Sequence, residues 1–149
     1  MVDDRLWAIN IETMSMGKNS VKFSENYMAL VDTGTTGIAG SVAYFTELLD
    51  GYWKETYDCD YWMSLPDVQM TFGGSDTIFN ISAEDYIVKM HAGPYSRCQP
   101  ALMPTPFPDD FKLIILGDTL MTKYYVHFDQ ANKQIGFAPQ VNPRKSITM

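Results

Sequence analysis

The sequence is short of basic residues, of cysteine and of long hydrophobic runs. Its 149 residues include 11 Lys and Arg against 18 Asp and Glu, which gives a formal net charge of −7. Phosphate binding needs clustered Lys and Arg, so this acidic balance argues against nucleic acid as the main partner. The longest apolar runs, such as Leu113–Leu116, are far shorter than the ~20 residues that cross a bilayer, so we expect no membrane span. Residues 1–5 are polar rather than a basic segment followed by an apolar one, so no signal peptide is expected within this chain.

The scarcity of cysteine and histidine argues against metal chemistry. Cys59 and Cys98 are the two cysteines, and they do not form the Cys-x-x-Cys spacing of zinc sites or thioredoxin-like redox centres. The count alone leaves two alternatives, which are one disulfide bond in an oxidising compartment or two buried thiols. His91 and His127 are isolated from each other and from both cysteines, and surface or strand roles suit them better. We therefore expect neither a metal ion nor a cofactor.

The overall composition predicts one strand-rich domain. Hydrophobic residues make up 46% of the chain, charged residues 19% and aromatic residues 13%, which is enough for a real core. Aromatic residues favour strands, and the frequent Gly and Pro favour turns, so we expect an all-β fold with a few short helices. The sequence shows no repeat and no long linker. Residues 1–139 are therefore expected to form the domain, and residues 140–149 a flexible C-terminal tail.

Hydrophobic patterns along the chain predict the individual elements. Strands are predicted at residues 7–12, 21–23, 27–31, 68–72, 77–81, 86–90, 113–116, 124–129 and 134–138. Short helices are predicted near residues 41–50, 82–85 and 118–123, the first with Val42, Phe45, Leu48 and Leu49 on its inner face. Five of the eight prolines lie between residues 93 and 110, which predicts that this segment is mostly loop.

Two buried apolar segments each end in small residues, and a carboxylate lies at one of these ends. The first segment leads into residues 32–35, Asp-Thr-Gly-Thr, and the second, Leu113–Leu116, leads into Gly117. Asp32 is costly to bury at a strand end unless hydrogen bonds or a shared proton compensate its charge. Gly34 allows a close backbone approach, and the neighbouring threonines supply short hydroxyls. On its own this motif favours a structural Asx cap at a strand end.

Several further segments extend the pattern in a fixed order from residue 6 to residue 139. They are Leu6-Trp7-Ala8-Ile9, Val31-Asp32-Thr33-Gly34-Thr35-Thr36, Ser64-Leu65-Pro66-Asp67-Val68, Met70-Thr71-Phe72-Gly73-Gly74, Ile115-Leu116-Gly117-Asp118, Tyr124-Tyr125-Val126-His127-Phe128-Asp129 and Ile135-Gly136-Phe137-Ala138-Pro139. Taken together, these segments resemble the pepsin-like aspartic proteases, and in particular their C-terminal lobe. The resemblance implies that residues 1–139 form a single lobe of the two-lobed, all-β acid protease fold.

The resemblance also implies roles for the residues around the motif. Asp32 resembles the second catalytic aspartate of the family. Thr33 resembles the threonine whose hydroxyl bonds across to the other lobe, and Gly34 matches the position whose amide helps hold the carboxylate. Thr35 is similar to the hydroxyl residue beside the carboxylate and the substrate.

Other parts of the site follow from the same resemblance. Leu116 and Gly117 look like the apolar-Gly element that crosses behind the active-site loop. Residues 103–108 correspond to a proline-rich loop at the border of the cleft. Cys59 and Cys98 match the disulfide bond of this lobe, so the resemblance favours a bond between them.

The implied activity is endopeptidase cleavage of polypeptides at acidic pH. Two carboxylates share one proton and hold a water molecule, and one acts as base while the other donates to the carbonyl oxygen. This chain has one Asp-Thr-Gly, because Asp118 is expected to begin a helix and Asp129 to lie in a hairpin. An N-terminal lobe is therefore the expected partner, in a secreted, lysosomal or vacuolar enzyme. The alternatives are a homodimer that pairs two copies of Asp32 and a catalytically silent binding protein.

The chain also departs from the family pattern. Residues 24–26, Ser-Glu-Asn, stand where many pepsins have a short disulfide loop, and Gly37 replaces a large apolar residue, which predicts altered packing behind the active-site loop. Residues 80–82, Asn-Ile-Ser, have the form of an N-glycosylation acceptor, so Asn80 is a candidate for modification.

Overall fold

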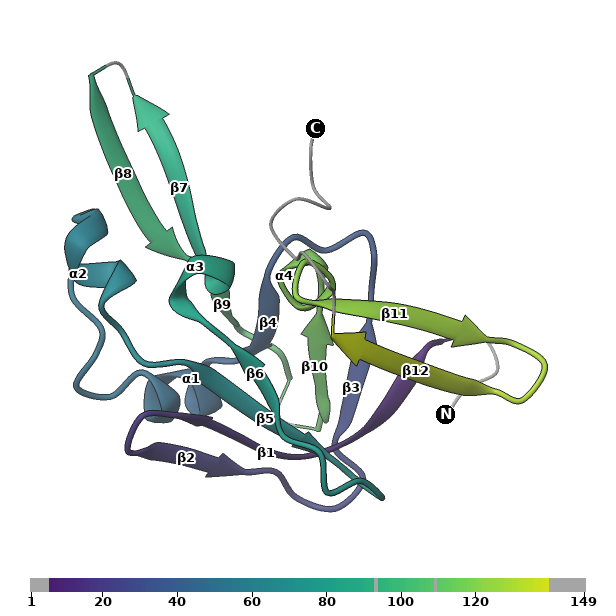
Figure 1. Cartoon of the computed structure of the whole chain (residues 1–149). Helices are drawn as coiled ribbons and strands as arrows, with labels where there is room; N and C mark the ends of the chain where they lie inside the picture. Colours follow the sequence, from purple (N-terminus) through teal and green to yellow (C-terminus); the bar gives the residue numbers. More distant parts are fainter. Residues whose placement is uncertain (1–5, 93, 109, 140–149) are drawn as a thin grey trace.

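The computed structural model describes residues 6–92, 94–108 and 110–139, and strands dominate it (Figure 1). The strands are β1 (Ala8–Met16), β2 (Asn19–Lys22), β3 (Met28–Val31), β4 (Ile38–Ser41), β5 (Val68–Phe72), β6 (Phe79–Ile81), β7 (Ile87–Ala92), β8 (Tyr95–Pro100), β9 (Leu102–Thr105), β10 (Leu113–Leu116), β11 (Tyr124–Asp129) and β12 (Gln134–Pro139). The helices are α1 (Val42–Leu48), α2 (Cys59–Met63), α3 (Ala83–Tyr86) and α4 (Asp118–Met121). The expected all-β class with short helices is confirmed. The expected tail, residues 140–149, lies outside the described residues.

The main sheet places two strands that are distant in sequence side by side. Its order is β6-β5-β1-β3-β10-β4-β9, and β2 pairs with β1 beside this path. Strand β10 runs parallel to β3, with Leu116 opposite Val31, and antiparallel to β4. Because β10 lies between β3 and β4, the connection formed by residues 32–37 crosses the carboxyl end of β10. Both β3 and β10 are apolar throughout, as expected for strands covered on both faces.

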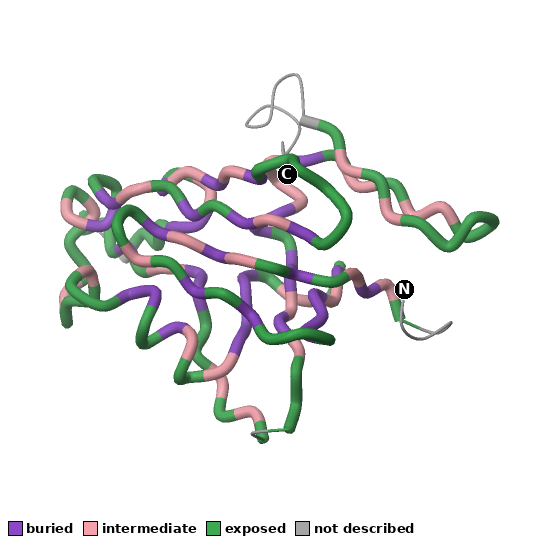
Figure 2. Tube along the Cα trace, turned by 90° about the horizontal axis from the view of Figure 1, so that it is seen from below, coloured by how far each residue is buried: buried purple, intermediate pink, exposed green. Residues whose placement is uncertain are grey.

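Two hairpins extend from this body. Strands β7 and β8 pair with each other, as do β11 and β12, and each pair forms a two-stranded sheet (Figure 1). Figure 2 shows buried residues concentrated in the central strands, whereas the projecting hairpins are mostly exposed. The predicted closing hairpin of residues 124–138 is confirmed by β11 and β12.

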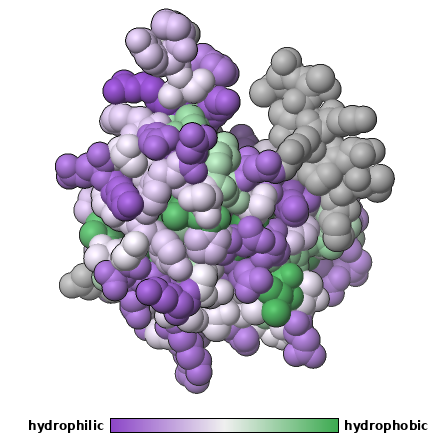
Figure 3. Space-filling view, turned by 60° about the vertical axis from the view of Figure 1, so that its left-hand side comes forward, coloured by the Kyte–Doolittle hydropathy of each residue, from purple (hydrophilic) through white to green (hydrophobic). Residues whose placement is uncertain are grey.

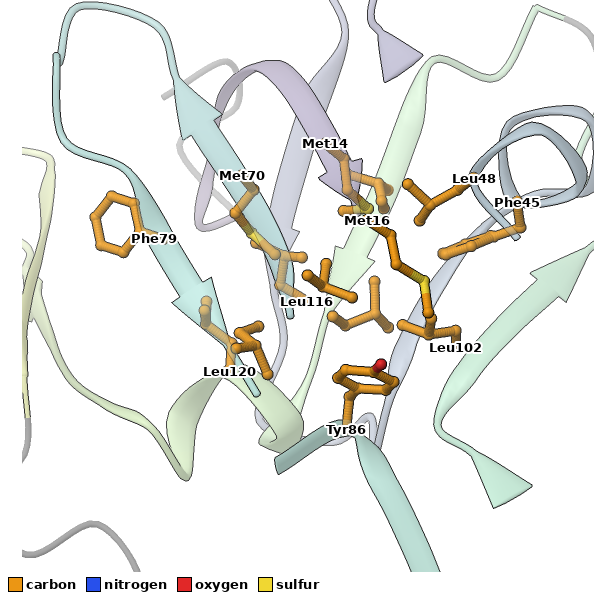
Figure 4. Packing of buried hydrophobic residues seen from close by; sticks show 14 of the residues in the cluster. Met14, Met16, Phe45, Leu48, Met70, Phe79, Tyr86, Leu102, Leu116 and Leu120 are labelled. Atoms are coloured by element: carbon orange, nitrogen blue, oxygen red, sulfur yellow. The ribbon is translucent and has the colours of Figure 1, made fainter. Parts of the chain in front are cut away.

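Methionine and aromatic side chains fill the core. Met14, Met16 and Met70 are almost fully buried, and Figure 4 shows them around Leu116, where their flexible side chains fill the core. Tyr86 is also fully buried, and its hydroxyl donates a hydrogen bond of 2.7 Å to a backbone carbonyl, so its polar end is satisfied.

The predicted loop at residues 93–110 is wrong for much of its length, because β8 and β9 lie within it. Strand β9 contains Pro104, which pairs with Gly40 of β4 in a parallel register. Proline is tolerated there because β9 is the last strand of the sheet, so one side of its backbone needs no hydrogen-bond partner from a further strand. The short strand β4 was also not expected, since its residues are small.

Helix α1 begins as predicted, with the Ser41 side chain accepting a hydrogen bond from the Tyr44 amide at 3.4 Å. Phe45 and Leu48 are buried on its inner face. Val42 was expected on the same face but is 46% exposed. A helix of seven residues makes just under two turns, so its first residue lies at the rim rather than over the core.

A disulfide bond joins Cys59 of α2 to Cys98 of β8, with an S–S distance of 2.08 Å. The bond ties the base of the β7–β8 hairpin to the helix. Next to it, the guanidinium of Arg97 lies 4.3 Å from the centre of the Tyr57 ring. Figure 3 looks onto the side of the molecule that carries α2 and this hairpin, where hydrophilic side chains surround small, separate hydrophobic patches.

An aromatic cluster closes the turn that lacks the family's short disulfide loop. The rings of Phe23 and Tyr27 flank residues 24–26, with their centroids 4.8 Å apart. Tyr44 of α1 contacts both rings, at 4.9 and 5.2 Å. Because all three rings meet, this turn is held to α1 by aromatic packing rather than by a covalent bond.

Candidate active site

Asp32 lies where β3 ends, and backbone hydrogen bonds hold it on both sides. Its amide donates to the carbonyl of Leu116 on β10 across 2.9 Å. The preceding amide, that of Val31, donates to the carbonyl of Trp7 across 2.8 Å. The position of Asp32 is therefore set by β1 and β10 together, while its side chain remains partly exposed.

Each oxygen of the Asp32 carboxylate accepts a hydrogen bond from the loop that follows. The Thr35 hydroxyl donates to Oδ2 across 2.6 Å, and the Gly34 amide donates to Oδ1 across 3.0 Å. These donors, the Thr35 hydroxyl first and the Gly34 amide second, hold the pKa of Asp32 below its usual value because both favour the charged form. The loop therefore fixes the orientation of the carboxylate and stabilises its charge.

Gly117 lies directly behind this loop and brings β10 against it. The Gly117 amide donates to the carbonyl of Gly37 across 2.9 Å. A Cβ atom at Gly117 would lie 2.0 Å from the carbonyl oxygen of Thr35, which no side chain can tolerate. Leu116, the residue before it, is completely buried. The sequence pattern of an apolar residue followed by glycine is thus explained by the crossing of the loop over β10.

The first turn of α4 adds further hydrogen bonds to the loop. The Asp118 amide donates to the carbonyl of Thr35 across 2.8 Å. The Thr119 amide and the Thr119 hydroxyl both donate to the carbonyl of Thr36, across 3.0 and 3.1 Å. The sequence patterns did not single out Thr119, although its place in the turn after Gly117 was a usable signal.

The structure explains why glycine stands at position 37, where the family pattern has a large apolar residue. A Cβ atom at Gly37 would lie 2.2 Å from the carbonyl oxygen of Ala101. The next amide, that of Ile38, donates to the same carbonyl across 2.8 Å. The missing side chain lets the segment that enters β9 lie directly against the start of β4.

An open depression of about 590 Å³ lies beside the carboxylate. It is lined by Leu6, Trp7, Leu30, Val31, Asp32, Thr33 and Phe128. The rings of Trp7 and Phe128 meet edge to face with centroids 5.0 Å apart, and Leu6 is 46% exposed. Sequence analysis identified Trp7 only as part of a strand and did not single out Phe128. The side chains beside Asp32 are therefore mostly apolar.

The other acidic residues considered from the sequence have separate environments. Asp118 is exposed in the first turn of α4, as expected for a residue that begins a helix. Asp129 lies at the end of β11, where its carboxylate accepts hydrogen bonds from the amide and the side chain of Asn132, at 3.1 and 2.8 Å. Both are thus accounted for by local structure.

Asn80, the candidate glycosylation residue, lies half-buried on β6. Its side-chain nitrogen donates to a carboxylate oxygen of Asp67. Its backbone amide donates to the Tyr124 hydroxyl across 2.8 Å, and its backbone carbonyl accepts from the same hydroxyl across 3.2 Å. Its Oδ1 is buried without a hydrogen-bond partner among the described residues. Glycosylation of Asn80 stays a prediction.

Within residues 6–92, 94–108 and 110–139, no three side chains of His, Cys, Asp or Glu are grouped closely enough to hold a metal ion. In the same part of the chain, no helix has the length and apolar character needed to cross a bilayer.

The fold is that of the aspartic-protease class. The family model described as eukaryotic aspartyl protease matches residues 1–140, and the chain belongs to this family. Pepsin A of Canis lupus familiaris is 30% identical over 140 residues, and pepsin A of Callithrix jacchus is 29% identical over the same length. Renin of Echis ocellatus is 29% identical over 139 residues.

The matches cover most of this chain but a much smaller share of each relative. Each match covers 89% of this chain but only 34–35% of the relative, so the chain spans about a third of the length of the curated relatives it matches. The similarity therefore extends over most of this chain and over one part of a longer enzyme.

Proposed function

We propose that residues 1–139 are the C-terminal lobe of an acid endopeptidase and that Asp32 is one of its two catalytic carboxylates. The observation that carries the proposal is the geometry at Asp32. Both carboxylate oxygens are held by donors from Thr35 and Gly34, and the group lies at an open, apolar depression. Such a carboxylate is fixed in orientation and still accessible to water, substrate and a second carboxylate.

The proposed reaction is hydrolysis of a peptide bond by two carboxylates and one water molecule. One carboxylate takes a proton from the water, and the other donates its proton to the carbonyl oxygen of the substrate. Two carboxylates in contact cannot both be ionised, so they share one proton. Asp32 supplies one of them, and a second lobe supplies the other.

The remaining residues of the site have supporting roles in this proposal. Thr35 and Gly34 orient Asp32, while Leu116 and Gly117 hold the loop from behind. Thr33 is exposed beside the depression, and its hydroxyl is proposed to bond across to the other lobe.

The partner is proposed to be an N-terminal lobe that covers the depression beside Asp32. Exposed apolar surface of this kind favours association, and here it consists of Leu6, Trp7 and Phe128 around a carboxylate. The relatives are long enough to contain a second lobe, since the matched part is about a third of their length. Polypeptide substrates would bind between the two lobes.

The proposed compartment is the exterior of the cell or an acidic lysosomal or vacuolar lumen. The disulfide bond between Cys59 and Cys98 supports this, because such bonds form and persist in oxidising compartments. An acidic lumen would also keep one proton on the pair of carboxylates.

Mixing the chain with a separately produced N-terminal lobe tests the proposal. Cleavage of denatured protein between about pH 3 and 6 should appear on mixing and should be blocked by a pepstatin-like inhibitor. Asp32→Asn should abolish it, whereas Asp118→Asn, which alters an exposed carboxylate at the start of α4, should not. Full turnover by Asp32→Asn, with the disulfide and the fold intact, would show that the site is wrongly assigned.

A further inference from the structure

Thr119 combines a polar side chain with nearly complete burial. It is 5% exposed, and among the described residues it is the one polar or charged side chain classed as buried. A buried hydroxyl is costly unless it forms a hydrogen bond. The Thr119 hydroxyl forms that bond outside its own helix, with the carbonyl of Thr36 in the active-site loop, 83 residues earlier in the chain.

Thr122, which caps the C-terminus of α4, behaves differently. The hydroxyl of Thr122 donates to the carbonyl of Thr119 across 2.9 Å, three residues back along the chain. A local bond of this kind is the usual arrangement for a helical threonine. The hydroxyl of Thr119 instead donates to a carbonyl of the active-site loop. Its bond therefore links α4 to the loop and also satisfies the buried hydroxyl.

The backbone of the loop is held at consecutive carbonyls. The carbonyl of Thr36 accepts both donors of Thr119, the amide at 3.0 Å and the hydroxyl at 3.1 Å. A carbonyl oxygen has two lone pairs, so this acceptor is saturated. The carbonyl of Thr35 accepts the Asp118 amide at 2.8 Å. Two successive peptide groups, those on either side of Thr36, are therefore fixed on α4. The first of them begins at Thr35, the residue that carries the hydroxyl bonded to Asp32.

We propose that Thr119 is a positioning residue that acts on Asp32 through the loop. The Thr119 hydroxyl fixes the Thr36 carbonyl, and with it the loop directly after the Thr35–Thr36 peptide group that the Asp118 amide holds. The loop backbone holds the Thr35 hydroxyl 2.6 Å from Oδ2 of Asp32. The consequence for catalysis rests on the proposed function, whereas the effect on the Asp32 carboxylate belongs to this chain by itself.

Two substitutions that differ by a single oxygen atom test the proposal. Thr119→Ala removes the hydroxyl and Thr119→Ser keeps it, while both lose the same methyl group. Thr122→Ala is the matched control, because it removes the other hydroxyl of α4 without touching the loop. The measurement is an NMR titration of the Asp32 side-chain carboxyl in the full 149-residue chain with its disulfide bond intact.

The expected result separates the variants. Thr119→Ala should raise the pKa of Asp32, since a weakened hydrogen bond to the charged form moves the value toward that of a free aspartate. Thr119→Ser and Thr122→Ala should leave it unchanged. A pKa that is the same in Thr119→Ala and Thr119→Ser would overturn the proposal, even if Thr119→Ala lowers the free energy of unfolding.

A replacement variant and an activity assay complete the test of the positioning role. If Thr119→Ala does not fold, Thr119→Val removes the hydroxyl at nearly constant volume and takes its place in the comparison with Thr119→Ser. In the enzyme assembled with an N-terminal lobe, Thr119→Ala should lower kcat several-fold with little change in KM, and Thr119→Ser should restore it. If the titration responds but the assembled wild-type enzyme is inactive, the proposed function is wrong and the positioning role stands.

Discussion

The hydroxyl of Thr35 lies 2.6 Å from Oδ2 of Asp32 and donates a hydrogen bond to it. This bond, with that from the Gly34 amide, favours the ionised carboxylate and lowers the pKa of Asp32. A second carboxylate placed against Asp32 would act in the opposite direction, because two like charges in contact cannot both ionise. The chain by itself therefore holds an anion, and the proton of the proposed catalytic pair would be taken up when the second lobe binds.

The first prediction concerns the dependence of stability on pH. The folded-state pKa of Asp32 lies below the unfolded value, so the ionised group stabilises the fold above the unfolded pKa. This contribution is lost as the pH falls through the folded pKa. Asp32→Asn should therefore lower the free energy of unfolding at about pH 6, by less than about 1 kcal/mol for so accessible a group, and should have no such effect near pH 2. Urea denaturation at both pH values measures it, and an equal loss at both would contradict it.

The second prediction concerns the contact between Gly117 and the loop. Gly117→Ala would place a methyl group 2.0 Å from the Thr35 carbonyl oxygen and 2.7 Å from that of Gly37. Either the loop or β10 must move, so we expect a loss of about 3 kcal/mol or more in the free energy of unfolding. Gly136→Ala is the control, since its new methyl group would meet its nearest atom at an ordinary 3.7 Å. Similar unfolding curves for the two variants would be inconsistent with the close approach at Gly117.

The elements that could be predicted from sequence are those with a strong apolar pattern. The strands Val68–Phe72 and Leu113–Leu116 have the bounds predicted for them, because each is a short apolar run between turn residues. Strand β9 could not be predicted, because Pro104 within it and Pro106 just after it favour a loop unless the strand is known to lie at a sheet edge. Helix α2 was missed because its five residues are too few to show a helical period.

The third prediction concerns the disulfide bond between Cys59 and Cys98, whose residues are 39 apart in sequence. Closing a loop of this length reduces the entropy of the unfolded chain, so replacing both cysteines with serine should lower the free energy of unfolding by about 3–4 kcal/mol. Chemical denaturation of the double variant and of the reduced wild-type chain should give similar values. If the double variant and the reduced chain were as stable as the oxidised chain, the bond would not constrain the unfolded state as assumed.

The fourth prediction concerns the aromatic cluster of Phe23, Tyr27 and Tyr44. Phe23 is 7% exposed and contacts both tyrosines, so Phe23→Ala should cost about 3–5 kcal/mol of stability. Phe111→Ala is the matched control, because Phe111 is 43% exposed. Thermal unfolding of both variants measures the difference. A control variant as unstable as Phe23→Ala would contradict the view that this cluster holds the turn to α1.

The residues of the candidate site that would do the chemistry could be predicted from sequence. The hydrogen bonds that hold their loop in place could not. Asp32, Thr33, Gly34 and Thr35 are contiguous, so their order alone indicates a carboxylate beside its own donors. The bonds from Thr119 to Thr36, which are 83 residues apart, depend on β10 lying between β3 and β4. Residue patterns within a short window contain no information about such a crossing.

The central claim is that this chain contributes one carboxylate and a second lobe contributes the other. The most direct measurement is acid proteolysis of a denatured substrate as an N-terminal lobe is titrated into a fixed amount of the chain. The account predicts no activity without the added lobe at any chain concentration, and activity that saturates at one lobe per chain. Pepstatin-sensitive activity of the chain alone, rising with the square of its concentration, would contradict the account and would show that two copies of Asp32 form the catalytic pair.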